Sequence, residues 1–241
     1  VHLWCVRERG VATIRARQFR DRALYFATHP LATIALMELM ERHERFSLHA
    51  ACLVSPAGNG VLLSGPSGSG KSTLTVALAA AGLEFLCDDL VFLAHGAGAA
   101  GDVEALGFAD TIGLSEFAAA RFPELRKRVA DGPAPGFPKR LARIEDLFGR
   151  PAVARCIPRA VVFPVVAAER PSAIKPLDAG EALLRLVPDV LLTEPSATQA
   201  HLGAIGALLK QVRCFELTSG ADLGRAAAIV VDAVDSGWVS R

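Results

Sequence analysis

The stretch GPSGSGKST, residues 65–73, combines the residue types that bind phosphate groups. It matches the pattern G-x-x-x-x-G-K-[ST] at every fixed position. Glycines let backbone N–H groups curl around an anion without Cβ clashes. Lysine supplies a point charge for the β/γ oxygens, and the serine hydroxyl can coordinate Mg²⁺. The predicted cofactor-binding residues are Gly65, Pro66, Ser67, Gly68, Ser69, Gly70, Lys71, Ser72 and Thr73.

The elements around this stretch also fit phosphate binding. An apolar run, residues 61–64, precedes it and a second, residues 74–81, follows it. A loop between a strand and a helix can hold the triphosphate of ATP or GTP, because the helix directs its partial positive end at the anion. The alternative is a Gly/Ser-rich turn that matches by chance, and the flanking elements favour the phosphate loop.

Two adjacent carboxylates, Asp88 and Asp89, interrupt the apolar run 83–93, which predicts one strand. Burying them without partners is costly. One can bind Mg²⁺ together with Ser72, and the other can accept a proton from an attacking hydroxyl. Neighbouring strand residues point to opposite faces, so both reach one site only if the strand ends or bends there. The alternative is a solvated pair at a strand end.

His49 begins a strand-like segment, residues 48–54, that is joined by a Pro/Gly/Asn turn to the strand before the glycines. An isolated histidine is more often structural than catalytic. The position of His49 near the hairpin end leaves the two roles equally open. The predicted catalytic residues are Asp88, Asp89, Lys71 and His49.

Lys139 and Arg140 close a segment, residues 131–140, that contains three prolines and two glycines and predicts a loop. They are candidates for a cationic clamp on bound phosphate groups. A solvated basic pair is an equal alternative.

The order of His49, a β-hairpin, GPSGSGKS, a helix and Cys87-Asp88-Asp89 resembles the catalytic domain of bacterial HPr kinase/phosphorylase. The resemblance covers residues 48–93. It implies an α/β P-loop domain of the HPr kinase or PEP-carboxykinase-like type, with ATP and Mg²⁺ as cofactors. It also implies transfer of the γ-phosphoryl group to a serine hydroxyl.

The same resemblance assigns roles to single residues. Lys71 corresponds to the lysine on the β/γ-phosphates, Asp89 to the proton acceptor, and His49 to the histidine beside it. A further metal-binding glutamate of the family corresponds to Glu104, with Asp102 as the alternative. For the family's late arginine the candidates are Arg170 and the pair Lys139 and Arg140.

The resemblance also implies partners. Short relatives occur beside peptide-modification genes, so the acceptor is expected to be a small protein or a ribosomal peptide such as a lasso peptide precursor. The family forms hexamers, which implies a homo-oligomer.

Strands and helices alternate along the chain and favour a layered α/β fold. We expect two units: residues 1–45, a small N-terminal strand and helix extension, and residues 46–241, the kinase core. Within them we expect short strands before residue 28, a helix over residues 31–46 with Pro30 at its start, a helix over 115–122 and a strand over 160–166. The predicted helix caps are Asp178, Ser196 and Asp222.

Composition limits the classes of function. The 241 residues are 51% hydrophobic with a formal net charge of +1, which predicts a sizeable core and no general affinity for nucleic acid or membrane surfaces. No run approaches the roughly 20 apolar residues that span a bilayer. The five cysteines are scattered without C-x-x-C spacing, so we expect a reduced, cytoplasmic protein without disulfides or a cysteine metal site.

The sequence therefore predicts an ATP-dependent kinase acting on a Ser or Thr hydroxyl. Two alternatives stay open: a small-molecule kinase with the same loop and acids, and a non-enzymatic ATP-binding regulator. Transfer of label to metabolites alone would favour the first, and ATP turnover unchanged by Asp89→Asn would favour the second.

Overall fold

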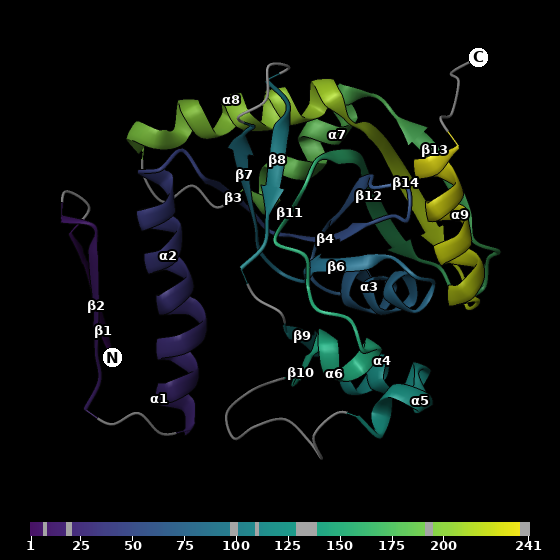
Figure 1. The fold of residues 1–241 in the computed structure, drawn as a ribbon, viewed down its shortest axis with the longest axis horizontal. Helices are drawn as coiled ribbons and strands as arrows, with labels where there is room; N and C mark the ends of the chain where they lie inside the picture. The colour runs from purple at the N-terminus through teal and green to yellow at the C-terminus, as the bar shows by residue number, and fades with distance from the viewer. Residues whose placement is uncertain are drawn as a thin grey trace.

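The computed structural model describes residues 1–6, 9–17, 21–96, 101–108, 111–128, 139–190 and 195–236. It is a mixed α/β fold with two main sheets (Figure 1). The larger has six strands in the order β13 (Ala173–Leu177), β14 (Arg213–Ser219), β12 (Pro158–Val166), β5 (Gly60–Ser64), β4 (Ala50–Val54) and β6 (Glu84–Cys87). The smaller has the order β11 (Arg155–Cys156), β8 (Val103–Leu106), β7 (Val91–His95) and β3 (Phe46–Leu48). The predicted α/β class is confirmed.

Both faces of the six-stranded sheet are covered. Helices α3 (Lys71–Ala80) and α9 (Leu223–Asp235) share one core with Leu63 and Val162. Helices α7 (Ala179–Leu186) and α8 (Pro195–Gln211) share the other with Leu62 and Val161. Consecutive strand residues thus enter opposite cores, which explains why these strands read as unbroken apolar runs. The predicted hairpin, the helix after the glycines and the strand over 160–166 are confirmed as β4–β5, α3 and β12.

The N-terminal elements lie beside the core rather than within its sheets. Strands β1 (His2–Val6) and β2 (Val11–Arg15) form an antiparallel hairpin that lies alongside helix α2 (Ala32–Glu41) (Figure 1). Helix α1 (Asp21–Phe26) and a π-helical segment (Ala27–Leu31) precede α2. Pro30 therefore lies inside a helical stretch, and the prediction that it starts the helix is wrong. Proline cannot donate an i→i−4 bond, and a π-turn is one way in which a helix continues past such a break.

Two predicted strands are each divided in two. The run 83–93 forms β6 and β7, with a bend at Asp88 and Asp89. The run 48–54 is interrupted at His49, between β3 and β4. In both places the chain passes between the six-stranded and four-stranded sheets, since β4 pairs with β6 and β3 with β7. The prediction of single strands is wrong because apolar residues on both sides of a bend suit two consecutive buried strands as well as one.

A small lobe carries part of the candidate site. Strands β9 (Thr111–Leu114) and β10 (Arg140–Arg143) pair, and helices α4 (Glu116–Arg121), α5 (Pro123–Arg126) and α6 (Ile144–Phe148) flank them (Figure 1). Its apolar residues join the core of α3. The helix predicted over 115–122 is confirmed as α4, which Ser115 caps by accepting from the Ala118 N–H. Most of the predicted loop 131–140 lies outside the described residues.

The predicted helix caps have different outcomes. Asp178 accepts from the Glu181 N–H at the start of α7, and Asp222 accepts from the Arg225 N–H at the start of α9, so both are confirmed. Ser196 lies inside α8, which begins at Pro195, so the cap predicted there is wrong. Proline suits a first helical turn and starts this helix earlier. The division at residue 45 stays a prediction.

Two general properties bear on function. The helices among the described residues are too short or too polar to cross a bilayer. All five cysteines are free thiols.

Candidate active site

The candidate site lies at one edge of the six-stranded sheet. Strand β12 runs parallel to β5 and β14, and β4 runs antiparallel to both β5 and β6. The carboxyl ends of β5, β6, β12 and β14 therefore meet at the same edge, where ligands bind in open α/β sheets. His49 precedes β4, which runs the opposite way, so it lies at this edge too. The topology brings together residues that are far apart in the sequence.

A cavity of about 630 Å³ opens at this edge. Its walls come from the segments that follow the parallel strands and from the small lobe. Its polar lining residues include His49, Lys71, Ser72, Asp89, Ser115, Arg121 and Lys139. Its less polar lining residues include Pro66, Val166, Ala168, Gly220 and Leu223. The volume falls in the range of small-molecule and cofactor sites.

The segment 65–70, here called the glycine loop, connects β5 to α3. Gly70 has φ +97° and Gly68 has φ +86°, conformations that residues with a Cβ rarely adopt. A Cβ on Gly70 would also lie 2.9 Å from Cγ2 of Val166. The loop thus needs glycine for its backbone shape and, at Gly70, for close packing on β12. It delivers the chain into the N-terminus of α3, whose backbone N–H groups and dipole attract anions.

Lys71 is nearly buried at the first position of α3. Its ammonium donates to the carbonyl oxygen of Gly65 and, at 3.4 Å, to that of Pro66. Burial lowers the pKa of Lys71, and the nearby carboxylates of Asp189, Asp89 and Asp88 oppose this shift. The charge is therefore held against the glycine loop, where an anion in the cavity would meet it.

Asp88 lies at the bend after β6 and turns toward α3. Its Oδ2 accepts from the Gly113 N–H at 3.2 Å and from the Ser72 hydroxyl at 3.4 Å. Its Oδ1 is buried without a hydrogen-bond partner. Burial, and next the charge of Asp89, raise the pKa of Asp88 to about 7. A buried carboxylate oxygen left without a donor is costly, and a cation would satisfy it.

The residues at this point fit a magnesium ion. The Ser72 hydroxyl and the Asp88 carboxylate offer the oxygen ligands that Mg²⁺ prefers. Within the described residues there is no group of three or more His, Cys, Asp or Glu that could hold a metal. Mg²⁺ in nucleotide sites is usually held by one or two protein oxygens together with phosphate and water. A cation here would therefore need oxygens from a bound phosphate.

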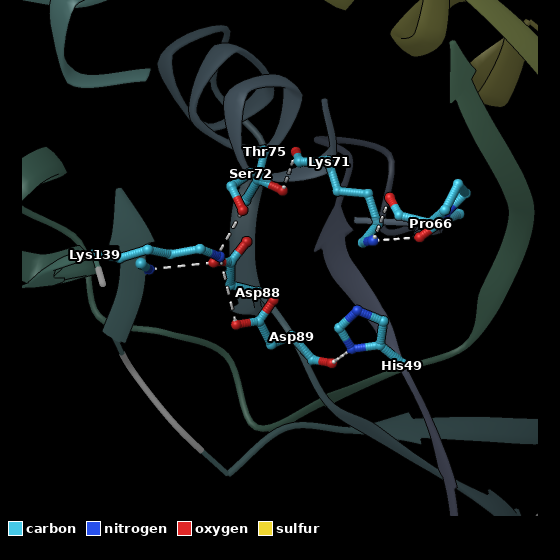
Figure 2. A network of polar contacts seen from close by, with 10 residues as sticks. His49, Pro66, Lys71, Ser72, Thr75, Asp88, Asp89 and Lys139 are labelled. Carbon is cyan, nitrogen blue, oxygen red and sulfur yellow. Dashed lines mark hydrogen bonds and ion pairs between the residues drawn. The ribbon is translucent and has the colours of Figure 1, made fainter. Parts of the chain in front are cut away.

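Asp89 faces the cavity. Its side chain is 57% exposed, and its Oδ2 lies 4.0 Å from the ammonium of Lys139. Its backbone carbonyl accepts a 2.7 Å hydrogen bond from Nδ1 of His49, which leaves Nε2 of a neutral ring with its lone pair. Figure 2 shows Ser72, Asp88, Asp89 and His49 in one succession of contacts. A carboxylate that is open to solvent beside a cation can accept a proton.

Four other candidates do not line the cavity. Arg140 forms a two-pronged ion pair with Glu116, at 2.7 Å and 3.0 Å. Asp102 lies 3.3 Å from Arg159, and Glu104 on β8 lies 3.9 Å from Arg155. Arg170 is likewise absent from the lining. Consecutive strand residues face opposite ways, so Lys139 points toward Asp89 while Arg140, the first residue of β10, points elsewhere.

The structure adds residues that sequence reasoning missed. Arg121, the last residue of α4, and Ser115, its cap, line the cavity. Asp189 is nearly buried against the start of the glycine loop and accepts from the Gly65 N–H at 2.8 Å. An acid within the apolar stretch Leu-Val-Pro-Asp-Val-Leu-Leu, residues 186–192, was the available signal for Asp189. Arg121 has no comparable signal in the sequence.

Comparisons with known proteins find a likeness among solved structures alone. No family model matches the chain, and no curated protein matches it either. Among solved structures, the chain is similar to the Hpr(Ser) kinase/phosphatase from Coxiella burnetii, with 13% identity and a TM-score of 0.43 over 78% of this chain and 95% of that one. Two folds correspond only loosely at that score, and the site is therefore assigned from its own geometry.

Proposed function

We propose that this protein is an ATP-dependent, Mg²⁺-requiring kinase that transfers the γ-phosphoryl group to a Ser or Thr hydroxyl of a small protein or peptide. One observation carries the proposal. The chain bends at Asp88 and Asp89 so that one carboxylate reaches the hydroxyl of Ser72 beside the glycine loop and the other faces the same cavity. Phosphate-binding, cation-binding and proton-accepting groups thus meet in one place.

Binding of ATP uses the glycine loop and the start of α3. The amide groups there and the ammonium of Lys71 neutralise the phosphate charge. The Lys71 ammonium exchanges the carbonyl oxygens of Gly65 and Pro66 for phosphate oxygens. Ser72 and Asp88 would hold the metal, which would supply positive charge that stabilises the phosphate oxygens. The apolar side chains of Val166 and Leu223, which line the cavity, suit the nucleobase.

Transfer requires a proton acceptor and an in-line hydroxyl. The acceptor oxygen attacks the γ-phosphorus, the bond between that phosphorus and the β,γ-bridging oxygen breaks, and ADP leaves. Asp89 accepts the proton that the hydroxyl loses. Lys139 lies close enough to stabilise charge on the moving phosphoryl group, and the His49 ring fixes the main chain of Asp89. Positioning and electrostatics supply most of the rate gain.

The decisive experiment is incubation with γ-labelled ATP, Mg²⁺ and serine-containing peptides from the native gene neighbourhood, read by mass. We expect label on a peptide with the wild type and none with Asp89→Asn, while both bind ATP equally. Asp102→Asn is the matched control, because Asp102 pairs with Arg159 outside the cavity and should retain transfer. Label on metabolites but never on polypeptides would reassign the acceptor. Equal ATP turnover by wild type and Asp89→Asn would leave a nucleotide-binding module.

A further inference from the structure

Asp189 ends a short 3-10 turn, η3 (Val187–Asp189), that follows α7. Its Oδ2 accepts from the Ser64 hydroxyl at 2.6 Å and from the Gly65 N–H at 2.8 Å. These two donors belong to the last residue of β5 and the first residue of the glycine loop. One carboxylate oxygen therefore fixes the point at which the chain leaves the sheet to form the loop.

The backbone of Asp189 also contacts the segment that contains His49. The backbone carbonyl of Asp189 accepts from the His49 N–H at 2.9 Å, at the interruption between β3 and β4. His49 in turn donates from its ring to the carbonyl of Asp89. Asp189 thus contacts both the glycine loop, which is proposed to hold the phosphates, and His49, whose ring holds the main chain of the proposed base.

A carboxylate is an unexpected choice for this position. It is nearly buried, and burying a charge costs far more than burying a neutral acceptor such as an amide. It also stands beside a cavity proposed to hold a polyanion, so its charge opposes the ligand, although the nearby Lys71 ammonium offsets part of that charge. The advantage of a carboxylate is a shorter, stronger charge-assisted hydrogen bond to each donor, which fixes geometry more closely. Close positioning of reacting groups is where a kinase gains most of its rate.

We propose that Asp189 is a positioning residue that fixes the spacing between the glycine loop and His49, and through the His49 ring the main chain of Asp89. The inference rests on the proposed function for its effect on transfer, but not for its effect on the loop itself. Asp189 is not among the residues that line the cavity, and it acts through Ser64, Gly65 and His49.

Three variants test separately the hydrogen-bond acceptor at position 189, its charge, and the Ser64 hydroxyl. Asp189→Ala removes the acceptor. Asp189→Asn keeps an oxygen that can accept from Ser64 and Gly65 but removes the charge. Ser64→Ala leaves the carboxylate with the Gly65 N–H. Thermal denaturation of each variant sets an assay temperature at which the wild type and all three variants are folded.

The first readout is amide hydrogen exchange of the segment that contains Gly65, measured without nucleotide. We expect exchange at Gly65 to rise about tenfold or more in Asp189→Ala, because the N–H loses a charged acceptor. Asp189→Asn should show a smaller rise. Wild-type exchange in Asp189→Ala would overturn the anchoring role.

The second readout is the division of the effect between kcat and KM for peptide phosphorylation at saturating Mg²⁺. We expect kcat to fall roughly tenfold to hundredfold in Asp189→Ala, with a smaller change in KM for ATP, and to recover partly in Asp189→Asn. Equal defects in both variants, or an effect on KM alone, would overturn positioning. If the wild type transfers no phosphoryl group, the proposed function fails, and the exchange measurement alone decides whether Asp189 anchors the loop.

Discussion

The hydroxyl of Ser72 donates to the carboxylate of Asp88 at 3.4 Å, and this contact joins the start of α3 to the bend after β6. The two residues come from different strand ends that the parallel arrangement of β5 and β6 brings to one edge. Because Oδ1 of Asp88 has no hydrogen-bond partner, the contact leaves a carboxylate oxygen available beside the hydroxyl. The acids therefore face the glycine loop and do not lie across the sheet from it.

Removing the Lys71 ammonium should abolish tight ATP binding. In Lys71→Ala the phosphates lose a charged donor, so we expect the Kd for ATP–Mg²⁺ to rise at least about tenfold and transfer to disappear. Isothermal titration calorimetry measures the first and label transfer the second. Lys175→Ala is the control, since Lys175 pairs with Glu216 outside the cavity. Unchanged affinity in Lys71→Ala would remove Lys71 from the site.

We expect substitutions of Lys139 and Arg140, which are adjacent in the sequence, to have different effects on kcat. Lys139 lies 4.0 Å from Asp89, whereas Arg140 is paired with Glu116. We expect Lys139→Ala to lower kcat roughly tenfold to hundredfold through lost charge stabilisation. Arg140→Ala should leave kcat near the wild-type value and lower the unfolding free energy through the lost ion pair with Glu116. Steady-state kinetics and urea denaturation of both variants decide this, and the reverse order of kinetic effects would contradict it.

The raised pKa of Asp88 predicts a pH-dependent stability. The folded pKa is about 7, above the unfolded value, so between about pH 4 and pH 7 the native state binds a proton that the unfolded chain has released. Stability contributed by this group therefore falls as pH rises through that window. In Asp88→Asn the loss is absent. We measure the unfolding free energy of Asp88→Asn minus that of the wild type, with EDTA present. We expect this difference to be more positive at about pH 8.5 than at about pH 5 by roughly 2 to 4 kcal/mol. Urea denaturation at both values measures this, and equal gains would contradict it.

Gly70 should tolerate no side chain. Gly70→Ala combines an unfavourable φ with a contact of 2.9 Å to Val166, so we expect lost ATP binding and a lower unfolding free energy. Gly58→Ala is the matched control, because Gly58 has φ +85° in the β4–β5 turn but nothing within 4 Å of an added Cβ. It should cost about 1 kcal/mol through its backbone alone and leave ATP binding intact. Similar ATP binding in the two variants would contradict the crowding argument.

The sequence predicted the local elements around the glycine loop more accurately than the path of the chain between sheets. A hairpin, a glycine-rich turn and a helix are encoded by turn residues and spacing, and β4, β5 and α3 follow them. The interruptions at His49 and at Asp88 and Asp89 have no such punctuation, because buried strands on both sides of a crossing are equally apolar. The two acids were the one visible sign that the second run could bend.

Candidate residues that are positioned by their neighbours in the sequence were predicted more accurately than those positioned by tertiary packing. Lys71 and Ser72 are placed by local geometry at the start of α3. Asp102 and Glu104 were assigned by correspondence with a family, and the structure directs both to arginines away from the cavity. Asp189 and Arg121 reach the site only through tertiary packing, which spacing along the chain cannot reveal.

Two residues that line the cavity, Gly220 and Leu223, come late in the sequence. They follow β14, whereas the glycine loop follows β5. During synthesis, a nascent chain would therefore contain the glycine loop, Ser72 and both acids long before it contained Gly220 and Leu223. If the proposed function holds, ATP binding should begin only after the β14 segment has emerged from the ribosome, and a chain released before Arg213 should expose the proposed phosphate-binding residues without enclosing a nucleotide.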